Sequence, residues 1–234
     1  MSDPLFRSKF YSAGASTKLA CVIAGYRGKI KSYATVVADL HQLGYDVVVY
    51  EHSATVLTEG DPQKLIDLVD GLRADFAKLS VNYEMAICTG ASIGAGLCLA
   101  LQTHFPIIKF GVYAGAGVSP PAAVFEAPLF YFVRRTFKKR GIDAPRLKSL
   151  WNNVDIIADT PMNHQSPFLI VLGKRDKIAN YRKAIRTFDA WRLRGEPIKV
   201  ITQPAMGHSR VIRWYKQNFV ELHQQAEQLA QNKR

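Results

Sequence analysis

The stretch Met85-Ala86-Ile87-Cys88-Thr89-Gly90-Ala91-Ser92-Ile93-Gly94 runs from five residues of strand character straight into a Gly-x-Ser-x-Gly pattern. Glycines on both sides of Ser92 suit a sharp turn from a strand into a helix, because they carry no Cβ to clash there. Such a turn lifts the Ser92 hydroxyl above the sheet and places the Ile93 N–H at the start of a helix. The alternative is a glycine-rich helix start in which Ser92 is a simple N-cap.

Strands and helices alternate on both sides of this turn. Apolar runs predict strands over 19–24, 46–50, 85–89, 107–113, 168–172 and 198–202, and helical spacing predicts helices over 32–43, 61–79, 180–194 and 211–231. Such alternation is typical of an α/β fold: a doubly wound, mostly parallel sheet of about six strands with helices on both faces. We expect residues 1–234 to form a single domain, since the length suits one.

Residues 118–165 break this rhythm and predict a lid-like insert within the domain. They contain five prolines, several aromatic residues and a basic run, but no good strand. From Pro128 to Arg140, apolar side chains recur on one helical face beside a basic face; they are Leu129, Phe130, Val133 and Phe137. This segment fits a lid over a substrate pocket, a packed surface helix or a contact with anionic lipid. We expect the lid, with basic residues at the pocket mouth that favour anionic substrates; these are Arg134, Arg135, Lys138 and Lys139.

The charge of the chain is unevenly distributed. The 234 residues carry a net charge of +12, and all of the excess lies in residues 118–234. A one-sided field attracts anions, but no helix-turn-helix, zinc finger or single-strand-binding pattern accompanies it, so we expect no nucleic-acid partner. No apolar run reaches the length of a membrane span, and the first residues lack the apolar core of a signal peptide. With three cysteines, an odd number, these features predict a cytoplasmic protein without a disulfide framework.

Two further residues could complete the chemistry of a nucleophilic serine, which needs a base and an acid to orient that base. Asp176 follows the predicted strand 168–172 by four residues, and His208 follows the strand 198–202 by six. In a parallel sheet these loops emerge at the same edge as the turn at Ser92, so we expect the three side chains to converge. The remaining histidines and the cysteines show no metal-ligand spacing, so we expect neither a metal nor a cofactor.

The order Ser92, Asp176, His208, each at the end of a strand, resembles the α/β-hydrolase family over about residues 17–234. The resemblance implies a shortened form of that fold, since only 18 residues precede the first predicted strand. It also implies an oxyanion hole made by the backbone N–H groups of Ile93 and Tyr26. We expect Arg27, Phe130 and Phe137 to contact the substrate. Asp155 and Asp159, both in the insert, are rival candidates for the acid.

The resemblance implies a serine hydrolase that cleaves a carboxylic ester of a small-molecule acyl substrate. Thioester, amide or lactone cleavage and acyl transfer use the same machinery, so the sequence leaves them open. A non-catalytic binding protein that retains the fold is a third alternative. The oligomeric state is also left open.

Overall fold

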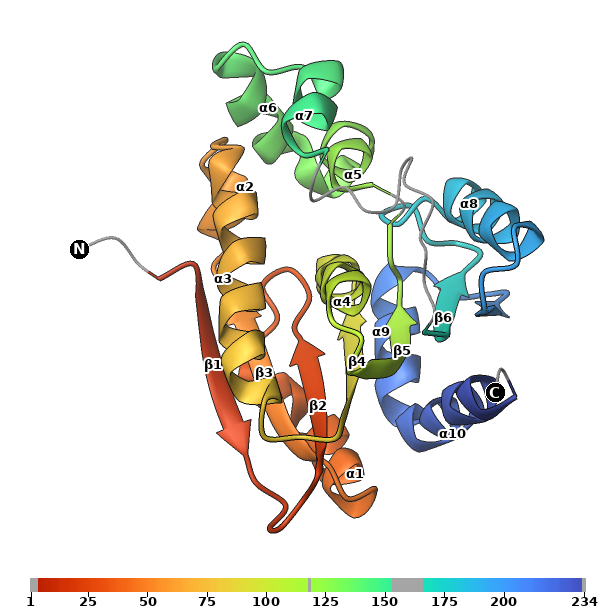
Figure 1. The fold of residues 1–234 in the computed structure, drawn as a ribbon. Coiled ribbons are helices and arrows are strands. Elements are labelled where there is room, and N and C mark those ends of the chain that lie inside the picture. The colour runs from red at the N-terminus through yellow and green to blue at the C-terminus, as the bar shows by residue number, and fades with distance from the viewer. Residues whose placement is uncertain (1–3, 118, 153–165, 233–234) are drawn as a thin grey trace.

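The protein is described by a computed structural model, which covers residues 4–117, 119–152 and 166–232. Their strands form one seven-stranded sheet in the order β1-β3-β2-β4-β5-β6-β7 (Figure 1). The strands are β1 (Phe6–Tyr11), β2 (Lys18–Ile23), β3 (Asp46–His52), β4 (Met85–Ala91), β5 (Ile108–Ala114), β6 (Phe168–Gly173) and β7 (Ile198–Gln203). Only the pairing of β1 with β3 is antiparallel within this sheet; all of its other pairings are parallel.

Helices connect the parallel strands. Those before β5 are η1 (Ile30–Tyr33), α1 (Ala34–Gln42), α2 (Thr55–Thr58), α3 (Gln63–Ser80) and α4 (Ile93–His104). Between β5 and β6 lie α5 (Pro120–Glu126), η2 (Pro128–Phe130), α6 (Tyr131–Lys139) and α7 (Ala144–Leu150). The chain ends with α8 (Tyr181–Leu193), α9 (His208–Gln217) and α10 (Phe219–Gln231).

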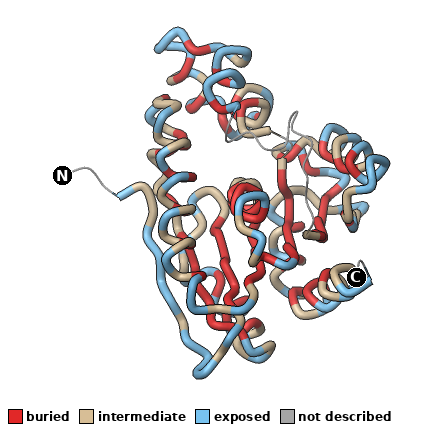
Figure 2. Tube along the Cα trace, in the orientation of Figure 1, coloured by how far each residue is buried: buried red, intermediate tan, exposed pale blue. Residues whose placement is uncertain are grey.

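Two buried cores lie on opposite faces of the sheet, because successive strand residues point to opposite sides. In β2, Cys21 faces the core formed with α3, α4 and α8, whereas Val22 faces the core formed with α1, α9 and α10. Figure 2 shows the buried residues concentrated along the strands and the central helix α4. The doubly wound, mostly parallel α/β architecture predicted from the sequence is confirmed.

Three expectations need correction. The sheet has a seventh strand, β1, which the sequence did not reveal because Phe6–Tyr11 is an edge strand with mostly exposed side chains. The predicted terminal helix over 211–231 is two helices, which meet at Asn218. The segment from Pro128 is likewise divided, into η2 and α6, so that Leu129 is exposed and does not join the buried stripe.

Candidate active site

Ser92 occupies a strained turn between β4 and α4, with φ 57° and ψ −128°. A non-glycine residue rarely adopts a positive φ, and such strain persists only where the surroundings impose it. Close packing of the turn imposes it here: a Cβ on Gly94 would lie 2.2 Å from the carbonyl oxygen of Ile23 in β2. The Ser92 N–H donates to the Ala114 carbonyl (2.8 Å), which ties the turn to the end of β5.

The loops after β6 and β7 are joined by their backbones. The Arg175 N–H donates to the Met206 carbonyl (3.1 Å), and a Cβ on Gly173 would lie 2.3 Å from that same oxygen. This close approach brings Asp176, from one loop, beside His208, the first residue of α9. Two residues that are 32 positions apart in sequence therefore meet at the carboxyl edge of the sheet.

Ser92, His208 and Asp176 form a continuous chain of hydrogen bonds. The distance from Ser92 Oγ to His208 Nε2 is 3.0 Å, and that from His208 Nδ1 to Asp176 Oδ2 is 2.8 Å. The other carboxylate oxygen, Oδ1, accepts the backbone N–H groups of Ile178 and Ala179 at 2.9 Å each. The Asp176 side chain is almost fully buried, and that of His208 is 11% exposed.

This arrangement determines the tautomer of His208. An ionised carboxylate can only accept hydrogen bonds, so Nδ1 carries the proton and donates it to Asp176. The lone pair of Nε2 is then directed at the Ser92 hydroxyl. The geometry can thus receive a proton from Ser92, as a general base does.

The two predicted oxyanion-hole donors, Ile93 and Tyr26, belong to segments that adjoin the Ser92 turn. Ile93 is the first residue of α4, so its N–H has no acceptor within that helix. The loop that contains Tyr26 passes against the Ser92 turn, because a Cβ on Gly25 would lie 2.9 Å from the Ala91 carbonyl oxygen and 3.4 Å from Ser92 Cβ.

An apolar cavity of about 70 Å³ opens beside Ser92 and His208. One buried water needs roughly 10–15 Å³ by this measure, so the cavity has room for several atoms of a bound group. Residues from both halves of the chain line this cavity. The lining includes Leu57, Leu65, Val69, Ile93, Gly96, Leu97, Ala100, Val124, Phe130 and Ile178.

Of the residues expected to contact substrate, only Phe130 is among the described residues that line this cavity. Phe137 is fully buried and packs edge-on against Trp151, with ring centroids 5.7 Å apart, so it anchors α6 instead. Arg27 is exposed, and its guanidinium lies over the Tyr26 ring at 5.4 Å.

The basic residues of α6 also lie outside the cavity lining. No Lys or Arg is found among the described residues that form it. Arg134 donates to the Phe125 carbonyl (2.6 Å), which is a structural contact. The expectation that α6 supplies charges to the pocket mouth therefore finds no support in the lining.

Gly115, which lies behind the His208–Asp176 pair, was not predicted from the sequence. Its φ is +58°, and a Cβ there would lie 3.2 Å from His208 Cε1 and 3.7 Å from Asp176 Oδ2. The available signal was its place directly after β5, at the same edge as the other three loops. Gly96 and Ala100 were missed as well, because the sequence does not tell which face of α4 borders a space.

The rival acids Asp155 and Asp159 lie outside the described residues. Within the part of the chain that is described, no group of three His, Cys, Asp or Glu side chains could hold a metal ion. In the same residues, no helix has the length and apolar composition to span a bilayer.

Comparison with known families gives one match: residues 52–231 fit the model of the prolyl oligopeptidase family. No match is found among curated protein sequences.

Solved structures with the same fold include several hydrolases. An acylaminoacyl peptidase of Pyrococcus horikoshii is 13% identical with a TM-score of 0.65; the match covers 94% of this chain but only 39% of the peptidase. A carboxylesterase of Nitrososphaera gargenis is 15% identical with a TM-score of 0.63, over 97% of this chain and 96% of that one. An acetyl xylan esterase of Paenibacillus sp. R4 is 12% identical with a TM-score of 0.65, over 92% and 79% of the two chains.

Proposed function

The chain belongs to the prolyl oligopeptidase family of α/β-hydrolase-fold serine hydrolases, and from this premise we propose that it cleaves esters of small carboxylic acids through an acyl-enzyme on Ser92. One observation carries the proposal: the hydrogen-bonded chain Ser92–His208–Asp176 borders an apolar cavity. The cavity fits the acyl group of the substrate, and the chain of hydrogen bonds fits activation of the nucleophile.

In this mechanism Ser92 Oγ attacks the carbonyl carbon of the ester while His208 Nε2 removes the hydroxyl proton. The imidazolium that forms is stabilised by the Asp176 carboxylate at Nδ1, and it then protonates the departing alcohol oxygen. Water, deprotonated by the same nitrogen, attacks the acyl-enzyme. The imidazolium then returns the proton to Ser92 Oγ as the carboxylic acid is released. The N–H groups of Ile178 and Ala179 donate to the other oxygen of Asp176 and so hold the carboxylate in position beside His208.

The negative charge on the substrate oxygen needs donors that are already in position. We assign this role to the N–H groups of Ile93 and Tyr26. The first is supported by its place at the N-terminus of α4, where the helix dipole favours an anion. The second is supported by the close approach of the Gly25 backbone to the Ser92 turn.

Peptide-bond cleavage is the second candidate, and it is favoured by the family match. Against it, none of the described residues that line the cavity is Lys, Arg, Asp or Glu. A peptide substrate presents several amide groups that need hydrogen-bond partners, whereas an acyl chain needs only apolar walls. We therefore rank ester cleavage first, and thioester cleavage or acyl transfer remain variants of it.

The test combines covalent labelling with turnover. A fluorophosphonate probe should label the wild-type protein on Ser92 and leave the Ser92→Ala variant unlabelled. Nitrophenyl esters of acetate, butyrate and octanoate, and N-acylated amino-acid anilides, are then compared by kcat/KM. We expect the short esters to be the best substrates and the anilides to be poor ones.

Three results would overturn the proposal. Labelling that persists in Ser92→Ala would place the reactive group elsewhere. A higher kcat/KM for the anilides than for every ester would make the protein a peptidase. A protein that takes no probe and turns over neither class would be a binding protein that retains the fold.

A further inference from the structure

The outward side of α6 carries an exposed stripe of aromatic and basic side chains, which we call the α6 outer face. Its members follow the helical spacing i, i+1, i+4, i+7 and i+8, so they lie on one side. They are Tyr131, Phe132, Arg135, Lys138 and Lys139. Phe132 is 76% exposed and Tyr131 is 52% exposed, which is unusual for side chains of this size. Leu129, just before them in η2, is 57% exposed.

The opposite side of α6 holds the helix firmly in place. Val133 and Phe137 are buried, and the Phe137 ring packs against Trp151. Arg134 spans the boundary, since its guanidinium donates to the Phe125 carbonyl and lies over the Tyr131 ring at 5.6 Å. The exposure of Tyr131 and Phe132 is therefore a consequence of a well-anchored helix, and it does not reflect a helix without packing partners.

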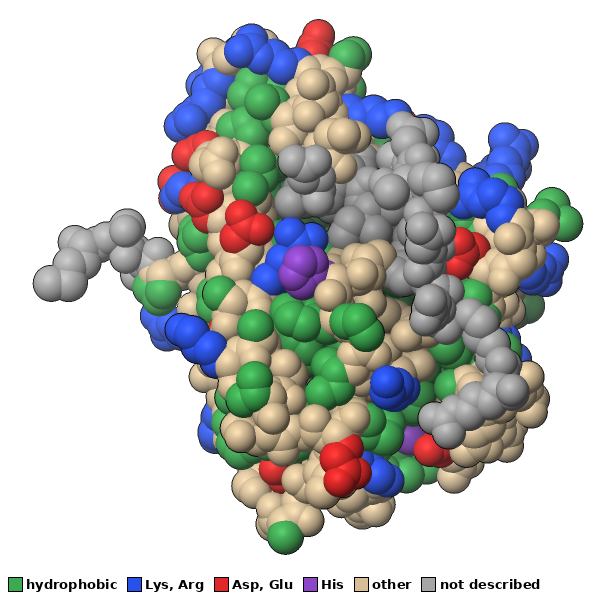
Figure 3. Space-filling view, viewed as in Figure 1, with side chains coloured by type: hydrophobic (Ala, Val, Ile, Leu, Met, Phe, Trp, Pro, Cys, Tyr) green, Lys and Arg blue, Asp and Glu red, His purple; other side chains and the backbone are tan. Residues whose placement is uncertain are grey.

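The segment that carries this face is strongly basic. Among the described residues 119–152, seven are Lys or Arg and two are Asp or Glu. One of the two acids, Glu126, is paired with Lys183 of α8. Figure 3 shows Lys and Arg side chains gathered at the end of the molecule where Figure 1 places α6 and α7.

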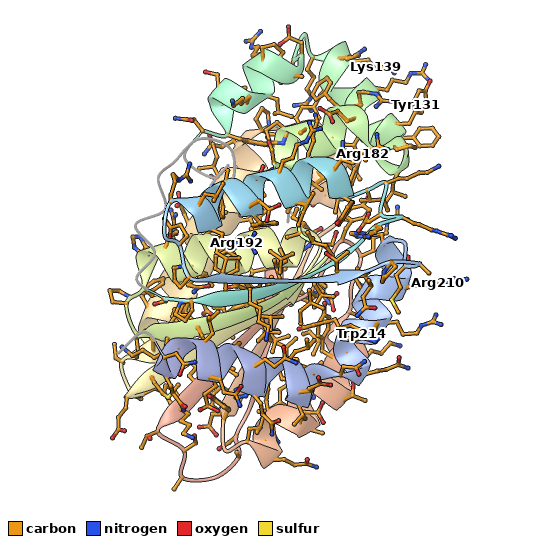
Figure 4. The ribbon with its side chains drawn as sticks, turned by 90° about the vertical axis from the view of Figure 1, so that its right-hand side faces the viewer. Tyr131, Lys139, Arg182, Arg192, Arg210 and Trp214 are labelled. Atoms are coloured by element: carbon orange, nitrogen blue, oxygen red, sulfur yellow. The ribbon has the colours of Figure 1, made fainter. Side chains whose placement is uncertain are left out.

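The α6 outer face also lies next to the proposed active site. Phe130, the residue before α6, lines the cavity beside Ser92 and packs edge-on against Tyr26. In Figure 4, Tyr131 and Arg210 both project from the same edge of the molecule. Arg210 is two residues after His208 in α9, so this edge is the one that carries the active-site loops.

We propose that the α6 outer face docks the protein onto the surface of an anionic phospholipid bilayer. The aromatic end of the stripe suits the boundary between headgroups and acyl chains, where amphipathic rings settle. The basic end suits the lipid phosphates, which attract Lys and Arg near the surface. Both ends have a partner in a bilayer, whereas a nucleic acid would match the basic end and leave Leu129 and Phe132 in water.

Flotation with lipid vesicles tests the proposal on the full chain. Binding to phosphatidylcholine vesicles is compared with binding to vesicles that also contain roughly one third phosphatidylglycerol. We expect binding only to the anionic vesicles and a steep loss of binding as salt is added, because screening weakens attraction between exposed charges.

Two variants separate the halves of the stripe. The quadruple variant Arg135→Gln/Lys138→Gln/Lys139→Gln/Arg140→Gln removes the three basic residues of the stripe together with exposed Arg140, which directly follows α6. It should reduce the partition coefficient by at least ~30-fold. The double variant Tyr131→Ser/Phe132→Ser should reduce it by about 10-fold or more, since it removes the apolar contact. Arg134 is left unchanged in both variants, because it is part of the packing. The matched control is Lys9→Gln/Lys31→Gln/Lys78→Gln/Lys109→Gln, which removes four exposed charges from other elements.

Turnover of a soluble ester and the melting temperature show that each variant is folded, and flotation of Ser92→Ala separates docking from catalysis. That variant should float like the wild type, so a failure of the proposed nucleophile would leave this inference intact. Equal binding to neutral and anionic vesicles, an equal loss in the control variant, or no flotation at all would overturn the proposal. So would DNA that binds the protein and displaces it from the vesicles.

Discussion

The two faces of the sheet are filled in different ways. On the side of α3 and α4, small residues such as Gly96 and Ala100 leave the apolar cavity open beside Ser92. On the side of α1, α9 and α10, aromatic rings fill the interior around His223, which lies 5.0 Å from the Phe110 ring and 5.5 Å from the Tyr45 ring. The same sheet thus supports an open face and a closed face.

This difference between the two faces indicates where a substitution can change the substrate specificity. A substitution on the open face fills existing space, whereas one on the closed face must displace a ring that already has neighbours. The edge of the sheet that carries Ser92, Asp176 and His208 lies between the open face and the closed face and depends on the packing of both. Each prediction below changes one of these three regions.

The largest effect is expected at the edge. Ser92→Ala should reduce kcat by about five to six orders of magnitude, because it removes the group that forms the covalent intermediate. The melting temperature should change little, since one hydroxyl is lost at an unchanged backbone. Turnover of a nitrophenyl ester and thermal unfolding measure the two outcomes, and a rate near that of the wild type would exclude Ser92 as the nucleophile.

The double variant Ser92→Ala/His208→Ala sharpens this result. Nucleophile and base act as a unit, so the second substitution should add almost nothing to the first. A further loss of several orders of magnitude would mean that the two residues act in separate steps.

Asp176→Asn should reduce kcat by about 10⁴-fold, because an amide no longer requires the proton of His208 to be on Nδ1. Asp155→Asn and Asp159→Asn serve as comparisons and should have mild effects. The three variants are ranked by kcat on one ester. A larger loss in either comparison variant would assign the acid to the segment between β5 and β6.

Gly96→Val is expected to change specificity on the open face. A Cβ at Gly96 meets nothing within 4 Å, and the residue lines the cavity, so the new side chain should occupy the space of an acyl chain. We expect kcat/KM for octanoate esters to decrease by about 100-fold, while that for acetate esters changes only slightly. The chain-length series measures this.

The matched control is Thr103→Val, which places the same side chain on the exposed side of α4. It should leave the preference for chain length unchanged. An equal decrease for acetate and octanoate esters in Gly96→Val would show that the variant damages the site as a whole, and that the acyl group binds elsewhere.

Much of the fold could be predicted because a buried strand is visible as an apolar run in the local sequence. The runs in β2, β4 and β6 and the glycines around Ser92 were sufficient to infer a parallel sheet with converging loops. The strand β1 was not predicted, since an edge strand buries little and its exposed residues leave no apolar run. The break at Asn218 was missed because helical spacing continues across it on both sides.

The candidate site, too, has a part that could be predicted from the sequence and a part that could not. The predicted positions of Ser92, Asp176 and His208 followed from strand ends, which a sequence reveals. The residues that line the cavity could not be predicted in this way, because whether Phe130 or Phe137 reaches the cavity depends on how α6 is rotated. That rotation results from contacts with distant residues such as Trp151, and no local pattern encodes it.

The closed face should reveal itself through the pH dependence of stability. Burial among aromatic rings, with Lys18 as a lesser cause, lowers the pKa of His223 from 6.5 to about 4. Its Nδ1 is buried with no hydrogen-bond partner among the described residues, which also favours the neutral ring. Below pH 6.5 the unfolded chain binds a proton here that the folded protein does not bind. The stabilisation is therefore complete above pH 6.5 and is lost as the pH falls toward 4.

Between pH 7 and pH 5 this single group should reduce the free energy of unfolding by about 2 kcal/mol. The variant His223→Leu cannot be protonated, so its free energy of unfolding should decrease less over this interval, by the same amount. Urea titrations at several pH values measure both curves, and His104→Gln, which replaces an exposed histidine of α4, serves as the control that retains His223. Identical slopes for the wild type and His223→Leu would mean that the closed face admits a proton as readily as the unfolded chain does. The contrast between the two faces of the sheet would then not extend to their electrostatics.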